Sequence, residues 1–351
     1  MSRPVMRMLG AFFALTLIVI GSVATSAYWL HSWWLKPIKL VTPITVTVAE
    51  GSTLQSVARQ FSQLQVVNGH ARMFELSWRL FTPGETVKAG DYRFMGTLSP
   101  DQVGRRLSSG ETVSVSFTIP EGWNTFQIAE RLANVFEGTS KKGWLDAMRD
   151  PKVTTPLPGS PSSTEGFLYP ETYTFRAKVA PKDVVSAMVN TFWKNIDKKL
   201  IKAGEDRNLN LLEVVTLASI IEKETGKAEE RPHISSVFHN RMRIGMRLQT
   251  DPTVIYGMWE QFDGNIRKKD LKTPTAYNTY VISGLPPGPI ASPGRAALEA
   301  AVNPIETKDL YFVSRGDGSH IFSSNFRDHQ KGVYQFQISP ARKKRSSDAR
   351  N

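Results

Sequence analysis

Two carboxylates, Glu222 and Glu224, follow a run of apolar residues and precede a glycine, Gly226. The apolar residues that begin at Leu211 would cover nearly every face of a helix, which predicts a buried helix rather than a surface one. A carboxyl in the last turn of such a helix lies at the negative end of the helix dipole and against apolar walls. Both effects disfavour its ionised form. We therefore expect one of these acids to stay protonated near neutral pH, as a general acid must.

The spacing of the two acids predicts different surroundings for them. Two steps along a helix rotate the side chain by about 200°, so Glu222 and Glu224 cannot share one face. One is expected to face a cleft, and the other to pack or to pair with Lys223, Arg231 or Arg241. Taken alone, the two acids also fit a solvated helix end with ionic partners.

Loops on both sides of this helix could hold further polar side chains. Gln249 precedes Asp251-Pro252, a strong helix start in which Asp251 is a possible cap. The segment 284–290 is rich in proline and glycine, and prolines stiffen a loop by reducing its chain entropy. Upstream, Glu165 stands among aromatic residues, a composition that suits sugar recognition but also an ordinary core strand.

Length and composition bound the class of protein. The chain has 351 residues, enough for one large domain or two ordinary ones. It contains no cysteine, which excludes disulfides, thiol nucleophiles and thiolate metal sites. Its net charge of +12 permits attraction to nucleic acid, to anionic lipid or to an anionic cell-wall polymer, and does not choose among them.

The N-terminal segment has the composition of a membrane anchor. Residues 8–35 contain no Lys, Arg, Asp or Glu, and the most apolar part, 9–30, could cross a hydrocarbon core about 30 Å thick as a helix. Because Arg3 and Arg7 precede it, residues 1–8 are predicted to be cytoplasmic. Three tryptophans at its far end fit an interfacial aromatic belt: Trp29, Trp33 and Trp34. A cleavable signal peptide is the alternative, although the apolar run is long for one.

Beyond the anchor, the pattern predicts an α+β protein with two domains. The first covers 43–117 and is expected to contain two strands and two helices. The strands are expected at 44–48 and 90–94, and the helices begin after Thr53 and Ser99. The stretch 46–61 resembles a LysM glycan-binding module, so we expect a small LysM-like subdomain.

The second and larger domain is predicted over 120–338. Its helices are expected from Pro181 to about Ala203, from a cap at Asn208 or Asn210 to the two acids, and from about Pro232 to Gly245. Two strands joined by a turn at 316–318 are expected near its end. The basic segment 339–351 is predicted to be a disordered tail.

Several motifs together resemble one family, the endolytic murein transglycosylases (MltG or YceG-like). The motifs are Glu165-Gly166 with Pro170 and Thr172, the run from Ala218 to Thr225, Ser236-Val237-Phe238 with Asn240-Arg241, Leu248 to Tyr256, Tyr277-Asn278-Thr279-Tyr280, and Gly284 to Gly288. The resemblance covers most of the chain after Ile44. It implies that the larger domain is a YceG-like α+β catalytic domain.

The resemblance also implies an activity. It implies a single-pass protein of the cell inner membrane, with its catalytic domain in the periplasm, that cleaves the β-1,4 bond between N-acetylmuramic acid and N-acetylglucosamine. The products would be 1,6-anhydro-muramyl ends, and the cleavage would limit the elongation of nascent peptidoglycan strands beside the peptidoglycan synthases. By the family's motif the catalytic acid/base falls on Glu224, and four residues match positions expected to line the substrate cleft: Glu165, Gln249, Tyr256 and Asn278.

One carboxyl group is enough for this chemistry. Ordinary glycosidases need a second carboxylate to activate water or to attack the sugar. In a lytic transglycosylase the substrate's own C6 hydroxyl is the nucleophile, and its intramolecular position replaces the second residue. No cofactor or metal ion is implied.

Three other classes of function compete with this interpretation. A non-catalytic scaffold could hold glycan through the small domain. A metal-dependent hydrolase could use Glu222, Glu224 and Asp251 as ligands, but the sequence contains no His-Glu-x-x-His spacing. A nucleic-acid role would depend on net charge alone, because the aromatic residues do not alternate with Lys and Arg.

Overall fold

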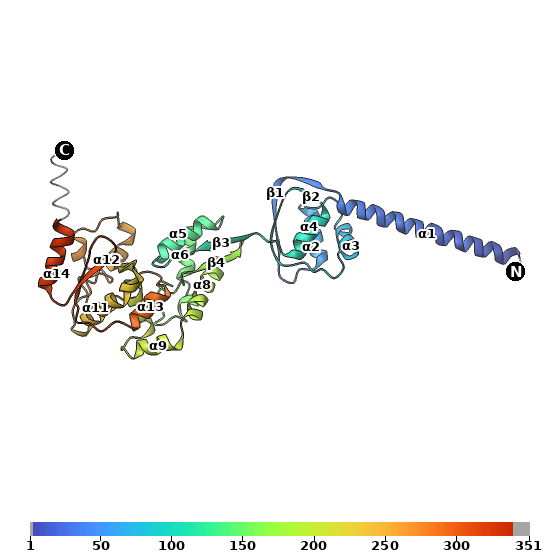
Figure 1. The fold of residues 1–351 in the computed structure, drawn as a ribbon. Helices are drawn as coiled ribbons and strands as arrows, with labels where there is room; N and C mark the ends of the chain where they lie inside the picture. Colours follow the sequence, from blue (N-terminus) through green and yellow to red (C-terminus); the bar gives the residue numbers. More distant parts are fainter. Residues whose placement is uncertain (1–2, 340–351) are drawn as a thin grey trace, which may run out of the picture. The chain divides into compact units, whose positions relative to one another are not determined.

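The computed structural model describes the backbone of residues 3–339 and the side chains of residues 12–339. The chain divides into a small unit, Met1–Val115 with Thr174–Lys178, and a large unit, Ser116–Tyr173 with Val179–Asn351. Figure 1 shows the elements of each unit in the colours of the sequence. The predicted basic tail lies, apart from its first residue, outside the described residues.

The small unit begins with one continuous helix, α1 (Arg3–Leu35). Its part from Phe12 to Leu35 is long and apolar enough to span a membrane. The last turns of α1 nevertheless pack into the protein. Trp34 is only 1% exposed, its ring lies 5.4 Å from that of Phe74, and the indole of Trp33 donates to the carbonyl of Asn68 at 2.6 Å. The prediction that Trp34 belongs to an interfacial belt is therefore wrong, because this side chain is part of the small unit's core.

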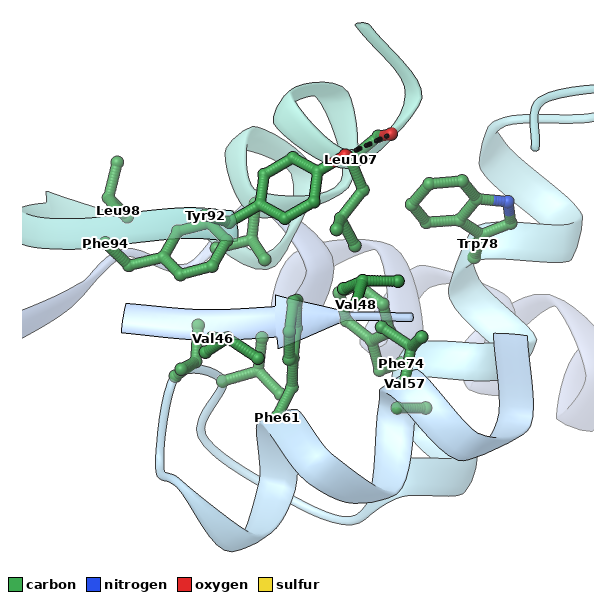
Figure 2. Packing of buried hydrophobic residues seen from close by; sticks show 14 of the residues in the cluster. Val46, Val48, Val57, Phe61, Phe74, Trp78, Tyr92, Phe94, Leu98 and Leu107 are labelled. Atoms are coloured by element: carbon green, nitrogen blue, oxygen red, sulfur yellow. Dashed lines mark hydrogen bonds between the residues drawn. The ribbon is translucent and has the colours of Figure 1, made fainter. Parts of the chain in front are cut away.

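The rest of the small unit is a two-stranded antiparallel sheet with three helices. These elements are β1 (Ile38–Val48), α2 (Leu54–Gln63), α3 (Ala71–Phe81), β2 (Gly90–Leu98) and α4 (Pro100–Ser109). The two strands pair from Ile38 opposite Leu98 to Val48 opposite Gly90, with an irregularity between Leu40 and Ile44. Figure 2 shows the core between them, where Val46 and Val48 of β1 and Tyr92 and Phe94 of β2 meet Phe61, Phe74 and Trp78 from the helices.

The predicted caps of the small unit are confirmed. The Thr53 side chain accepts from the Ser56 amide at the start of α2, and Ser99 forms a reciprocal capping box with Gln102 at the start of α4. Helix α3 has no counterpart in the prediction. The LysM-like character of this unit stays a prediction, because the order of its elements establishes only a mixed α and β unit.

The first part of the large unit contains short helices and one pair of strands. Its helices are α5 (Thr125–Val135), α6 (Lys141–Met148), α7 (Pro151–Thr154), α8 (Pro181–Asn195) and α9 (Lys198–Glu205). Strands β3 (Ser114–Thr118) and β4 (Thr172–Arg176) form a two-stranded sheet, and the division between the two units falls within both strands. The prediction of one helix from Pro181 to Ala203 is wrong, because Ile196 is extended and Asp197 caps a new helix by accepting from the Leu200 amide.

The second part of the large unit surrounds the predicted buried helix. Its elements are α10 (Leu211–Glu224), α11 (Arg231–Arg243), α12 (Asp251–Gly257), α13 (Arg295–Val302), β5 (Tyr311–Ser314), β6 (His320–Ser323) and α14 (Phe326–Val333). Short helical turns occur at Ala228–Glu230, Trp259–Gln261, Asp270–Lys272 and Tyr334–Ile338. The hairpin of β5 and β6 is antiparallel, as predicted.

Helix α10 is the buried helix that the sequence predicts. Every residue from Val214 to Ile221 is buried, and α11 and α13 pack against it. Of the two possible caps, Asn210 is the one used, in a capping box with Glu213. The helix ends at Glu224, so its last residue is the second of the two acids.

Candidate functional site

A groove of about 510 Å³ opens at the C-terminal end of α10. Several parts of the large unit contribute to it: the end of α10, α11, the segment that leads into α12, the segment around Tyr280, the hairpin of β5 and β6, and α14 with the helical turn that follows it. The polar and aromatic residues that line it include Glu224, Arg241, Gln249, Thr250, Asp251, Tyr280, Tyr311, Phe312, His320, Phe326 and His329. The groove thus combines two acids, Glu224 at the end of α10 and Asp251 at the start of α12, with several aromatic rings.

Glu224 is held by the residue that precedes α12. The hydroxyl of Thr250 donates a hydrogen bond to Oε1 of Glu224. Thr250 is 2% exposed and occupies the N-cap position of α12, yet its side chain makes no capping bond to that helix. Its own amide donates to the hydroxyl of Thr279 at 3.0 Å. The side chain of Thr250 therefore hydrogen-bonds to the acid and does not cap its own helix.

Burial raises the pKa of Glu224 to about 7. The negative charge of Asp251 acts in the same direction, whereas the Thr250 hydrogen bond and the positive charges of His320 and Arg241 lower the pKa. A substantial fraction of this carboxyl is consequently protonated at neutral pH. The shift has the direction that the sequence pattern predicts.

Glu222 lies in different surroundings, as its spacing from Glu224 predicts. Its carboxylate pairs with Arg231 at 2.8 Å and accepts from the amide of Gly294 at 2.9 Å. The side chains of Glu222 and Arg231 are only 5% and 9% exposed. A second acid, Glu121, lies 3.7 Å from the same guanidinium, and burial together with the charge of Glu222 raises the pKa of Glu121. Glu222 thus joins α10 to α11 and to the start of α13.

His320 approaches the groove from β6 and is held by Glu230. The Nδ1 atom of His320 lies 2.7 Å from Oε2 of Glu230, and the His320 backbone amide donates to Oε1 at 2.9 Å. Burial acts to raise the pKa of Glu230, but hydrogen bonds from His320 outweigh it and hold the pKa below its ordinary value. Because the carboxylate fixes Nδ1 as the donor, a neutral His320 ring has its lone pair on Nε2.

Arg241 supports the floor of the groove. Its guanidinium donates to the carbonyls of Leu310 and Leu248, each at 2.6 Å, and lies 5.4 Å from the centre of the Tyr311 ring. Its side chain therefore joins α11 to the segment before α12 and to the segment before β5. The sequence suggests Arg241 as a partner of an acid, and in the structure its close partners are carbonyls and a ring.

Asp251 is the first residue of α12 and not its cap, because Thr250 occupies the cap position. Its carboxylate accepts from the hydroxyl of Tyr280 at 2.7 Å. Gln249 lines the same groove in a left-handed conformation, with φ of 48°, and its backbone N–H donates to the carbonyl of Thr279 at 3.2 Å. The structure thus brings Gln249 and Glu224 together.

Glu165 and Tyr256 meet each other but do not line this groove. The hydroxyl of Tyr256 donates to Oε2 of Glu165 at 2.9 Å, and Thr125 at the start of α5 donates its amide and its hydroxyl at 3.0 and 2.7 Å. Glu165 is 4% exposed, and burial raises its pKa to about 7 against these hydrogen bonds. The Tyr256 ring also packs against the Tyr277 ring, 4.7 Å away.

Asn278 is completely buried and does not line the groove either. Its amide nitrogen donates to the carbonyls of Asp270, Leu271 and Thr273 at 3.1, 3.2 and 2.7 Å. Its amide oxygen accepts from the backbone of Tyr280 at 2.9 Å. Every polar atom of this side chain is thus used to fold the segment that presents Tyr280 to Asp251.

Sequence reasoning did not single out Thr250, His320 or Glu230. A signal existed for Thr250, since a threonine before Asp-Pro is a standard cap whose hydroxyl could also bond elsewhere. For His320 and Glu230 the sequence offers none, because they lie far apart along the chain and meet only in the folded protein.

The comparisons with known proteins agree on one family. The model of the YceG-like family matches residues 46–335. A Bacillus subtilis protein named endolytic murein transglycosylase is 28% identical over 314 residues, which cover 84% of this chain and 85% of that protein. A Streptococcus pneumoniae protein of the same name is 27% identical and is covered over 58% of its length. The crystal structure of a putative yceG-like protein from Listeria monocytogenes is 32% identical, with a TM-score of 0.57, and covers 83% of this chain and 99% of that one.

Proposed function

The chain belongs to the YceG-like family, and we propose that it is a lytic transglycosylase acting on peptidoglycan glycan strands. Two of its relatives carry the name endolytic murein transglycosylase. The observation that carries the proposal is Glu224, a carboxyl with a pKa of about 7 in a groove lined by aromatic side chains. Such a group can both give and take a proton at neutral pH.

In the proposed reaction Glu224 acts first as an acid and then as a base. Its proton passes to the bridging oxygen as the bond from C1 of N-acetylmuramic acid to that oxygen breaks. The C6 hydroxyl of the same sugar forms the new bond to C1, and the Glu224 carboxylate takes the proton that this hydroxyl loses. The products are a 1,6-anhydro end and a free hydroxyl on the N-acetylglucosamine, and Glu224 is protonated again.

The surroundings of Glu224 support both roles. Aromatic faces can stack on pyranose rings, and Phe326, which is 55% exposed, supplies such a face in the groove. Thr250 fixes the rotamer of the acid and keeps its pKa from rising further. Among the residues that the structure describes, Asp251 is the one other carboxylate in the same groove, and it is hydrogen-bonded to Tyr280.

The remaining predicted site residues are proposed to act in two ways. Gln249 lines the groove and is assigned to direct contact with the substrate. Glu165, Tyr256 and Asn278 are assigned to positioning, because their polar atoms are used within the protein.

The location proposed for the enzyme follows from α1. An anchor over its apolar part would hold the large unit at a membrane, and the basic residues before it favour a cytoplasmic N-terminus. We propose the inner membrane, with the catalytic unit in the periplasm. There the enzyme would meet nascent strands beside the peptidoglycan synthases and limit their elongation.

Product analysis in water enriched in heavy oxygen tests the reaction. The full chain is used in detergent, since a truncation after α1 would remove Trp34 from the core of the small unit. Uncrosslinked glycan strands should yield anhydro-muramyl ends without heavy oxygen. Reducing ends that carry heavy oxygen would mean hydrolysis, with Asp251 as the second carboxylate in the groove. Strand binding without any cleavage would mean a scaffold.

A further inference from the structure

Near the end of α1, largely exposed residues are followed by residues that pack into the small unit. Tyr28 and Trp29 are 77% and 60% exposed, whereas Leu30 and Trp34 are 7% and 1% exposed. The ring of His31 lies 5.0 Å from that of Phe81, the last residue of α3. Leu30 and Trp34 are thus covered by protein on one face of the helix, while His31 and Ser32 on the other side stay exposed. Because a bilayer surrounds a spanning helix on every side, a bilayer around α1 is expected to end near Trp29.

The length of α1 agrees with this boundary. From Met8, the first residue of the uncharged run, to Trp29 the helix is about 33 Å long at ~1.5 Å per residue, which matches a hydrocarbon core of about 30 Å. Tyr28 and Trp29 then occupy the interface, where aromatic residues are enriched. Phe81 contacts the very next turn of α1, so the end of α3 lies at the level of the lipid headgroups.

Helix α3 turns one face toward the core of the small unit and the other away from it. Phe74, Ser77 and Trp78 are buried, and the Phe74 ring lies 5.4 Å from that of Trp34. In Figure 1, α3 lies on the side of the small unit from which α1 extends. The face opposite to the core therefore points toward the region that a bilayer around α1 would occupy.

The outward face of α3 carries a mixed apolar and basic stripe. Leu76 and Leu80 are 51% and 55% exposed, and the side chain of Arg79 is 66% exposed. Together with the exposed Arg72 they follow the spacing i, i+4, i+7 and i+8, which places them on an arc of about 100°. Arg79 also pairs with Glu75 at 2.9 Å, but an exposed pair of this kind is weak and leaves the guanidinium accessible.

We propose that this stripe of α3 (Arg72, Leu76, Arg79 and Leu80) is a membrane-contacting surface. The two leucines enter the boundary between headgroups and acyl chains, and the two arginines bind lipid phosphates, as on an interfacial amphipathic helix. The proposal depends on α1 being a membrane anchor. It goes beyond the enzymatic activity, because it predicts that the small unit lies directly on the bilayer and does not swing freely from the anchor.

The absence of native cysteine makes this surface directly measurable. Single cysteines are introduced in the full chain at Leu80, at Leu17 within α1 and at Lys178, and each is labelled with a fluorophore sensitive to polarity. Lys178 is the matched control. It belongs to the small unit and is exposed, and its amide donates to Asp91 at 3.0 Å, which lies about 23 Å along β2 from Leu98, the partner of the first residue of β1. The labelled proteins are reconstituted in phosphatidylcholine and phosphatidylglycerol vesicles with and without lipids that carry a nitroxide quencher.

We expect lipid-borne nitroxide to quench the labels at Leu17 and Leu80 and to leave the label at Lys178 unchanged. Replacing Arg72 and Arg79 by Gln should weaken the quenching at Leu80 and not that at Leu17. Quenching at Leu17 alone would overturn the proposal while leaving the anchor intact. A label at Leu80 that is shielded from water but not quenched would mean that a protein surface covers the stripe. Quenching at neither position would refute the anchor, and the proposal with it.

Discussion

The hydroxyl of Thr250 donates to the carboxyl of Glu224 and so joins the start of α12 to the end of α10. The bond opposes the effect of burial on the acid, because a hydrogen bond to the charged form lowers the pKa while desolvation raises it. Thr250 is therefore a positioning residue for the proposed acid/base. Its contribution can be separated from that of burial by mutation.

Replacing Thr250 by Val should move the pH profile of strand cleavage to higher pH. The substitution keeps the shape of the side chain and removes the hydroxyl, so the pKa of Glu224 should rise above 7. The free enzyme must carry the proton on Glu224, and activity is lost as the pH rises through its pKa. The measurement is the pH dependence of kcat/KM, and in particular the pH at which it falls on the alkaline side. Thr250→Ser keeps the hydroxyl and should retain the original limb, and an unchanged limb in Thr250→Val would refute the role of the bond.

Replacing His320 by Gln should shift the same alkaline limb in the same direction. The positive charge of His320 lowers the pKa of Glu224, but it ranks below the Thr250 bond among the causes of the shift. The displacement should therefore be smaller than in Thr250→Val. A loss of activity without any displacement would mean that His320 serves only to pack β6 against Glu230.

Glu165 should make the stability of the folded chain depend on pH. Its folded pKa of about 7 exceeds its ordinary value of 4.5, so folding favours the protonated form. The resulting contribution to the free energy of unfolding is fully present below the unfolded pKa. It is lost as the pH rises through about 7, and the loss is on the order of 3 kcal/mol. Glu165→Gln should therefore lose less thermal stability than the wild type between about pH 5 and pH 8. The exposed Glu260→Gln is the control, and equal losses in all three proteins would contradict the prediction.

Replacing Glu222 by Gln should destabilise the fold and spare the chemistry. The substitution leaves the guanidinium of Arg231 buried beside a neutral amide, with Glu121 at 3.7 Å as the remaining acid. Breaking a buried pair typically costs about 3–5 kcal/mol. Urea denaturation measures this loss, and the folded fraction should cleave strands at nearly the original rate. Normal stability with no cleavage would instead make Glu222 the catalytic acid.

The sequence predicts α10 and its end well, and the reasons are local. Apolar residues on nearly every face leave a buried helix as the only plausible structure, and Asn210 caps it through its own neighbours. The two acids take different surroundings because a helix turns by about 100° per residue. Such features depend on residues a few positions apart, which is the range over which a sequence pattern can be interpreted.

The features that the sequence does not predict depend on contacts between distant segments. A tryptophan at the end of an apolar helix has the same pattern whether it faces lipid headgroups or a protein core, and Trp34 faces a core. A motif match also identifies a residue without giving the direction of its side chain. Gln249 therefore lines the groove, while Asn278 is used entirely within its own loop.

The most direct test of the account compares Glu224→Gln with the wild type in a strand-cleavage assay followed by mass spectrometry. The amide cannot donate the proton, so anhydro-muramyl ends should fall by a factor of about 10² or more. Since Glu224 has a raised pKa, its replacement should not lower the thermal stability near pH 8. Glu222→Gln, assayed as folded protein, is the matched control and should still form these ends. Anhydro ends formed at the wild-type rate by a folded Glu224→Gln protein would contradict the account.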